Sequence, residues 1–174
     1  MAQQPLKLSV IGLSKAGKTS IVHRVKYQTF LQNPKMTIGI LPEVVNIGGL
    51  CFVLWDVGGQ TLRALWNLYR KGTKGMLYVI DAANPRRFIQ NQNALKRAAR
   101  DAKQENVPLA ILANKVDIAD PRMLEKLLQT LELPEQAGNV KVFRTSAKTG
   151  VGVKEVMAWI TERIGLQKTQ QTDY

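Results

Sequence analysis

The stretch that decides the fold is Gly12-Leu13-Ser14-Lys15-Ala16-Gly17-Lys18-Thr19, which fits the pattern G-x-x-x-x-G-K-[ST]. The apolar run Leu6 to Ile11 precedes it and predicts a strand, and apolar residues at helical spacing follow it from Lys18 to Phe30. A glycine-rich turn between a strand and a helix lets the backbone wrap a phosphate. The helix N-terminus adds free N–H groups and a positive dipole end. The context therefore predicts a phosphate-binding loop, here called the P-loop.

The residues of the P-loop have separate expected roles. The Lys18 ammonium would reach the β- and γ-phosphates of a nucleotide, and the Thr19 hydroxyl would hold Mg²⁺. The expected nucleotide contacts in and beside this loop are Gly12, Ser14, Lys15, Ala16, Gly17, Lys18, Thr19 and Ser20.

The rest of the chain alternates between strands and helices. Further strands are expected at Leu41–Ile47, Leu50–Trp55, Gly75–Ile80, Val107–Ala113 and Val140–Thr145. Further helices are expected at Arg86–Glu105, Pro121–Leu131 and Val153–Ile164, the last closed by Gly165. The alternation predicts an α/β fold with a doubly wound, mostly parallel six-stranded sheet and about five helices. We expect one domain over residues 1–165 and a polar C-terminal tail over 166–174.

A second motif, Asp56-Val57-Gly58-Gly59-Gln60, follows the third expected strand. Ligands of open α/β sheets bind at the carboxyl ends of the strands, so this segment faces the same edge as the P-loop. The Asp56 carboxylate would hold the Mg²⁺ shell from the side opposite Thr19. The Gly59 amide would bond a γ-phosphate, and Gln60 would orient a water for in-line attack. The alternative is a plain turn with no chemical role.

Two later motifs predict recognition of guanine. Asn114-Lys115-Val116-Asp117 and Ser146-Ala147-Lys148 each follow an expected strand. Guanine presents N1–H and a 2-amino group on one edge, and the single carboxylate of Asp117 accepts both, whereas adenine offers neither. A site built on that pairing rejects adenine, because the carboxylate would stay unpaired. The stem of Lys115 would lie over the base, and the Ala147 N–H would reach guanine O6.

From about Leu6 to Ile164 the chain resembles the small GTPases, and within them the Arf and Arf-like branch. The stretch Trp55 to Gln60 carries the resemblance, together with Leu65-Trp66, Tyr69 and Thr37-Ile38-Gly39. Thr37 and Trp55 are 18 residues apart, as in Arf proteins. The resemblance implies a GDP/GTP switch with slow hydrolysis that a partner accelerates, and with protein effectors, an exchange factor and a GTPase-activating protein as partners.

The resemblance also assigns catalytic and metal-binding roles. It implies that Thr37 meets both Mg²⁺ and the γ-phosphate when GTP is bound. The metal ligands would then be Thr19, Thr37 and Asp56, and the catalytic residues would be Gln60, Lys18 and Thr37.

The chain departs from the Arf pattern in several places. Ala2 replaces the myristoylated glycine, only five residues precede the first strand, and the tail has no cysteine for prenylation, so we expect no lipid anchor. The run Gln60 to Trp66 is one residue shorter than in Arf proteins. Lys15 replaces the usual Ala or Asn, and it either raises intrinsic hydrolysis or is a solvated surface lysine. Phe30 either lies edge-on to the base or belongs to the core.

The charge of the chain favours anionic partners. Twenty-five Lys and Arg residues against 13 Asp and Glu give a net charge of +12. The basic residues gather after the second motif and along the third expected helix region: Arg70, Lys71, Lys74, Arg86, Arg87, Lys96, Arg97, Arg100 and Lys103. This face is either simply solvated or contacts an anionic membrane or an acidic protein. Nucleic acid is not expected, because no exposed aromatics interleave with the charges.

The remaining sequence features suggest a reducing compartment. Cys51 is the single cysteine, lies in an apolar run and is expected to be buried. No signal peptide precedes the first strand, so we expect a cytoplasmic protein, peripheral at membranes if it meets them. We also expect a monomer. A different class of function stays open, in which GTP is a structural ligand of an assembly module whose basic face docks an acidic protein complex or RNA.

Overall fold

The structure is a computed structural model that describes residues 4–32, 34–35, 40–47, 50–57, 70–131 and 139–171, with side chains up to residue 165. The strands are β1 (Leu6–Ile11), β2 (Ile40–Ile47), β3 (Leu50–Val57), β4 (Gly75–Asp81), β5 (Leu109–Asn114) and β6 (Val140–Arg144). The helices are α1 (Lys18–Tyr27), α3 (Phe88–Gln104), α4 (Pro121–Thr130) and α5 (Val153–Gln171), and the short 3₁₀ turn η2 (Pro85–Arg87) leads into α3.

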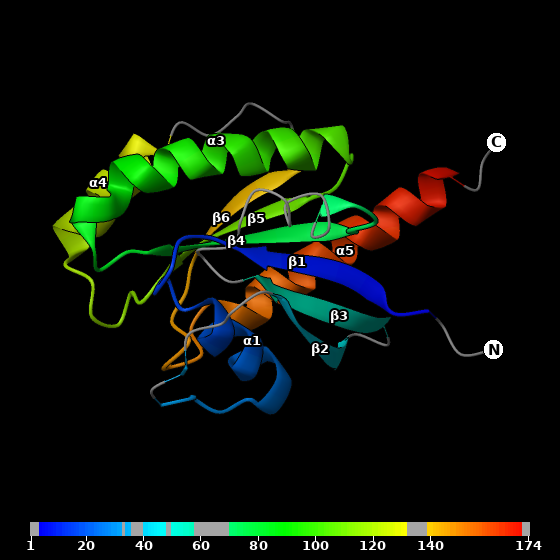
Figure 1. Cartoon of the computed structure of the whole chain (residues 1–174), viewed down its shortest axis with the longest axis horizontal. Helices are drawn as coiled ribbons and strands as arrows, with labels where there is room; N and C mark the ends of the chain where they lie inside the picture. The colour runs from blue at the N-terminus through cyan, green and yellow to red at the C-terminus, as the bar shows by residue number, and fades with distance from the viewer. Residues whose placement is uncertain are drawn as a thin grey trace.

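The six strands form one sheet in the order β2-β3-β1-β4-β5-β6. β2 pairs antiparallel with β3, and every other neighbouring pair is parallel. α1 and α5 cover one face of the sheet, and α3 and α4 cover the other (Figure 1). The predicted doubly wound α/β fold is confirmed, with four α-helices and one 3₁₀ turn among the described residues.

Each face of the sheet has its own apolar core. On one face Leu8, Val10 and Leu54 pack with residues of α1 and α5. On the other face Met76 and Tyr78 pack with residues of α3 and α4. β4 and β5 are buried nearly throughout because helices cover both of their faces, which explains their uninterrupted apolar sequences.

The order of the strands makes β1 the point at which the chain changes direction across the sheet. The connection after β1 leads to β2 and β3 on one side of it, and the connection after β3 leads to β4 on the other side. Such a switch point is where open α/β sheets bind their ligands. The GLSKAGKT loop leaves β1 at this point.

Three details differ from the sequence-based expectations. α1 ends at Tyr27 because Gln28 adopts a left-handed conformation (φ 59°), and Phe30 beyond it is 40% exposed, so its assignment to the core is wrong. The predicted end of the last helix at Gly165 is also wrong, since α5 continues to Gln171. Gly costs about 1 kcal/mol in a helix interior, and the good helix formers that follow offset it. Cys51 is half-buried rather than buried.

Other local predictions are confirmed. The Asp120 carboxylate caps α4 by accepting the N–H groups of Arg122 at 2.8 Å and Met123 at 3.2 Å, and Pro121 opens the helix. Trp159 is 7% exposed and packs edge-on against Phe143. Within the described part of the chain, no helix has the length and apolar character needed to cross a bilayer.

Candidate functional site

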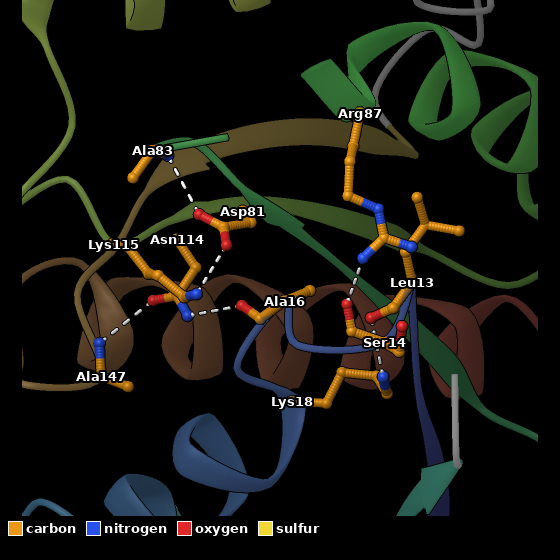
Figure 2. A network of polar contacts seen from close by, with 10 residues as sticks. All are labelled: Leu13, Ser14, Ala16, Lys18, Asp81, Ala83, Arg87, Asn114, Lys115 and Ala147. Atoms are coloured by element: carbon orange, nitrogen blue, oxygen red, sulfur yellow. Dashed lines mark hydrogen bonds and ion pairs between the residues drawn. The ribbon is translucent and has the colours of Figure 1, made fainter. Parts of the chain in front are cut away.

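Hydrogen bonds join the P-loop, the ends of β3 and β5, and the loops that follow β5 and β6 into one site. The described residues of the four sequence motifs all lie at this carboxyl edge of the sheet. Figure 2 shows the part of this site in which the P-loop, Arg87 of η2 and the two segments predicted to recognise guanine meet. The sequence prediction that the motifs converge is therefore confirmed for their described residues.

Two glycines of the P-loop allow a close approach of neighbouring groups. A Cβ at Gly12 (φ 142°) would lie 2.2 Å from the Val79 carbonyl oxygen of β4. A Cβ at Gly17 (φ 95°) would lie 2.4 Å from the Asn114 amide nitrogen. Any side chain at either position would therefore displace the P-loop from the sheet or from the segment after β5.

Lys18 is the buried cation of the site. The residue is 6% exposed, and its ammonium donates to the carbonyl oxygens of Gly12 at 3.2 Å and Leu13 at 3.0 Å. Burial lowers the pKa of Lys18, the Asp56 carboxylate opposes that effect, and the Arg87 guanidinium adds to it. A desolvated ammonium inside a loop of backbone donors is a strong binding group for phosphate oxygens.

Thr19 and Asp56, the two described residues predicted to bind a metal ion, are hydrogen-bonded to each other. The Thr19 hydroxyl donates to Asp56 Oδ2 at 2.5 Å, which joins the start of α1 to the end of β3. Asp56 is 1% exposed. A hydroxyl and a carboxylate are oxygen ligands, the kind that Mg²⁺ prefers, so the donor set fits this ion.

Asn114 connects two binding loops. Its amide donates to the Ala16 carbonyl of the P-loop at 3.0 Å, and its side-chain oxygen accepts the Ala147 N–H at 3.1 Å. The residue is 1% exposed. Asn114 therefore holds the loop predicted to bind phosphate and the segment predicted to bind the base in a fixed relative position.

Asp117 and Lys115, the two residues expected to contact the base, are each held by a polar contact. The Ser146 hydroxyl donates to Asp117 Oδ1 at 2.6 Å, which orients the carboxylate assigned to guanine. The Lys115 ammonium donates to Asp81 Oδ2 at 2.6 Å, at the end of β4. The other oxygen of Asp81 accepts the Ala83 N–H at 3.1 Å, so this carboxylate is itself fixed. The stem of Lys115 is thus anchored at its far end.

Arg24 contacts the candidate site although it belongs to none of the four sequence motifs. From α1 its Nε donates to the Ala147 carbonyl at 2.8 Å, and its Nη2 donates to the Lys148 carbonyl. Its Nη1 donates to the Gln28 carbonyl at 2.7 Å, where α1 ends. One guanidinium thus joins the base-recognition loop to the exit of α1.

Replacing this arginine is expected to loosen the bound base. In Arg24→Ala the loop around Ala147 loses its charge-assisted hydrogen bonds, each of which contributes about 1.5–3 kcal/mol net of the exchange with water. We expect GDP to dissociate roughly tenfold faster, measured by the fluorescence of a labelled GDP after addition of unlabelled nucleotide. The control is Lys26→Ala, which removes another cation of α1. The ammonium of Lys26 pairs with Glu43 of β2 at 2.5 Å and not with the loop around Ala147. Equal dissociation rates for the two variants would contradict the role of Arg24.

Some predicted residues lie outside the described residues, and others have a different position from the one expected. Thr37, Gly59 and Gln60 belong to the first group, and their assigned roles stay predictions.

Arg87, assigned to the basic surface, is half-buried and donates to the P-loop. Arg70 is paired with Asp101 and Glu105 at 3.9 Å and 3.4 Å. Both arginines therefore contact other groups of the same chain and contribute less to the basic surface than the sequence suggested. Lys15 is exposed, as both of its interpretations allow.

Comparison with protein families and sequences gives a consistent result. The model of the ADP-ribosylation factor family matches residues 1–164. ADP-ribosylation factor-like protein 4D of Homo sapiens is 36% identical over 170 residues, which cover 92% of this chain and 84% of that protein. ADP-ribosylation factor-like protein 1 of Caenorhabditis elegans is 31% identical over 165 residues, covering 94% of this chain and 91% of that protein.

Comparison with solved structures agrees. The Arl6 BBS3 small GTPase from Trypanosoma brucei, solved with the bound nucleotide analogue GppNp, superposes with a TM-score of 0.78. Its sequence is 26% identical, and the alignment covers 94% of this chain and 99% of that one.

Proposed function

The chain belongs to the ADP-ribosylation factor family of small GTPases, and from this premise we propose that it is a Mg²⁺-dependent GTPase that switches between GDP-bound and GTP-bound forms. The observation that carries the proposal is the linked set of loops at the carboxyl edge of the sheet. Asn114 joins the phosphate loop to the base loop, and Thr19 joins the phosphate loop to Asp56. One ligand that spans these loops needs a phosphate chain at one end and a purine at the other.

Thr19 and Asp56 are the described residues that would hold Mg²⁺, with Thr37 as the third ligand in the GTP form. Their oxygen atoms and the burial of Asp56 support this assignment. The ion would neutralise charge on the β- and γ-phosphates as the bond between them breaks.

Hydrolysis would depend on position and charge. Lys18, released from the carbonyls of Gly12 and Leu13, would bind the β- and γ-phosphates and offset the charge that grows between them. Gln60 would orient the attacking water in line with the leaving GDP. The products are GDP and phosphate. Ordering of residues 30–40 and 57–69 by the γ-phosphate would present GTP-specific surfaces to effectors.

The role of Gln60 is tested by the substitution Gln60→Leu. We expect single-turnover GTP hydrolysis to slow by about tenfold or more, because the leucine cannot orient the water. GTP affinity should stay within about twofold of the wild type, since water positioning contributes little to binding. A hydrolysis rate equal to that of the wild type would contradict the assignment.

We further propose that the basic surface of α3 contacts anionic membranes. Lys96, Arg97, Arg100 and Lys103 are exposed along this helix. Each basic residue near an anionic surface contributes about 1 kcal/mol, so the four together would contribute about 4 kcal/mol to a reversible contact that weakens with salt.

Co-sedimentation with liposomes of anionic or neutral lipid tests this contact. We expect wild-type protein to bind anionic liposomes, and the double variant Lys96→Glu, Arg100→Glu to lose most of that binding. The matched control reverses two exposed cations elsewhere, Arg122→Glu and Lys154→Glu, and should keep binding. Comparing the liposome binding of protein loaded with GDP and protein loaded with a non-hydrolysable GTP analogue shows whether the membrane contact depends on the bound nucleotide. Absence of binding at physiological salt, or equal loss in both double variants, would reject the α3 surface.

A further inference from the structure

One arginine outside the four motifs reaches the P-loop. Arg87, the last residue of η2, donates from Nη1 to the Ser14 carbonyl oxygen at 2.6 Å, across 73 residues of sequence. Figure 2 shows Arg87 approaching the loop from η2, whereas Lys18 approaches it from α1. This contact ties the phosphate loop to the start of α3.

A buried polar pair fixes the backbone from which Arg87 extends. Asn91 donates from its side-chain amide to the Arg87 carbonyl at 3.0 Å. The Tyr78 hydroxyl donates to the Asn91 carbonyl at 3.3 Å and lies 3.4 Å from its side-chain oxygen. Both Asn91 and Tyr78 are 1% exposed, and burial raises the pKa of Tyr78, which keeps its hydroxyl protonated. Arg87 therefore acts from a rigid base.

The contact with Ser14 also determines where the next N–H points. In a planar trans peptide the C=O and N–H bonds point in opposite directions. Because the Ser14 carbonyl points to Arg87, the N–H of Lys15 points away from Arg87. Lys18, the expected phosphate ligand, approaches the loop from that opposite side (Figure 2).

The inward orientation of the Lys15 N–H requires an unfavourable backbone conformation at Lys15. Lys15 has φ 65°, a left-handed conformation in which an L residue is crowded and a glycine is not. Rotation of the Ser14–Lys15 peptide about its two flanking bonds would return Lys15 to a negative φ and would turn its N–H outward. The present orientation therefore needs an interaction that holds the Ser14 carbonyl, and a charge-assisted hydrogen bond provides one.

We propose that Arg87 is a positioning residue of the nucleotide site, which holds the Ser14–Lys15 peptide so that the Lys15 N–H faces the bound phosphates. The inference rests on the proposed function, because it requires a nucleotide whose phosphates accept backbone N–H groups at the start of α1. Arg87 itself touches the loop from outside and acts through the peptide.

The first test uses the full chain with Arg87→Ala and Arg87→Lys. We expect labelled GDP to dissociate about tenfold faster from Arg87→Ala, and about threefold faster from Arg87→Lys, which keeps a cation but not the planar fork of donors. Arg87→Lys also covers the case in which the alanine variant does not fold. The matched control is Arg86→Ala, which removes the neighbouring, exposed arginine and should leave the rate unchanged. Wild-type rates in both Arg87 variants would overturn the proposal.

A second readout reports on the peptide itself. In protein labelled with ¹⁵N-lysine, the Lys15 amide should shift on GDP binding in the wild type and lose part of that shift in Arg87→Lys. A shift equal to that of the wild type would overturn the proposal, because a purely structural role for Arg87 would leave this amide bound to phosphate.

Two double variants separate backbone strain from the loss of the lysine charge. Both Arg87→Ala, Lys15→Gly and Arg87→Ala, Lys15→Ala lack the Lys15 ammonium, but only the glycine relieves the left-handed strain. We expect the glycine variant to release GDP about fivefold more slowly than the alanine variant. Equal release from the two would overturn the peptide-orientation argument. If the wild type bound neither GDP nor GTP, the proposed function would fail, whereas normal wild-type binding with unaffected Arg87 variants contradicts the Arg87 role alone.

Discussion

Asp117→Asn is expected to change the base preference of the protein from guanine to xanthine. The Asp117 carboxylate would accept both N1–H and the 2-amino group of guanine. An asparagine at this position presents an NH₂ donor to the 2-amino group, so one favourable pair becomes donor against donor. Sites that hydrogen-bond a ligand reject mismatched analogues by large factors, and we expect GTP affinity to fall roughly 10²–10³-fold. Xanthine has an oxygen at the 2-position, which accepts from the new amide.

The geometry around Asp117 favours a specific effect. Ser146 donates to Asp117 Oδ1 at 2.6 Å, and the side-chain oxygen of an asparagine accepts the same bond, so the loop should keep its shape. The experiment is competition of GTP and xanthosine triphosphate against labelled GDP. Asp120→Asn is the matched control, because it makes the same charge change three residues later and asparagine caps α4 as well as aspartate does. An unaltered base preference in Asp117→Asn would refute the guanine assignment.

The fold followed from the sequence because its local signals agreed with one another. Apolar runs such as Leu109–Asn114 are typical of strands covered on both faces, and Asp120-Pro121 marks a helix start. Helix ends were less predictable. The periodicity of apolar residues continues to Phe30, but the left-handed turn at Gln28 ends α1 before it. Gly165 has the residue type of a helix end, yet α5 continues through it to Gln171.

The residues of the candidate site also fall into two groups, those that the sequence predicts and those that only the structure shows. Its motifs are contiguous, so the sequence predicts Lys18, Thr19, Asp56 and Asn114 directly. Arg24 and Arg87 contact binding loops 123 and 73 residues away, and no spacing rule connects such positions. Arg87 was assigned to the basic surface because it is close in sequence to other cations. Its side chain instead reaches the P-loop from a backbone that Asn91 bonds, and Asn91 is in turn bonded by Tyr78.

Lys18→Met is expected to cause the largest loss of nucleotide binding. Methionine has similar length and keeps the apolar stem, but it has no charge to offer the β- and γ-phosphates. Truncating one partner of a desolvated, hydrogen-bonded charge pair costs about 3–4 kcal/mol, which corresponds to roughly 10²–10³-fold in affinity for both GDP and GTP. The measurement is equilibrium binding of labelled GDP and of a labelled non-hydrolysable GTP analogue.

Two further variants distinguish the role of Lys18 from a general effect of positive charge. Lys26→Met removes a half-buried ammonium from the same helix and should bind nucleotide like the wild type. Lys18→Arg keeps the charge but should recover little affinity, because a planar guanidinium differs in shape from the ammonium of a residue that is only 6% exposed. If Lys18→Met bound GDP within about threefold of the wild type, the loop would not be using this ammonium as its phosphate ligand. The +12 charge of the whole chain would then be the more probable source of its attraction for nucleotides, and high salt would abolish binding.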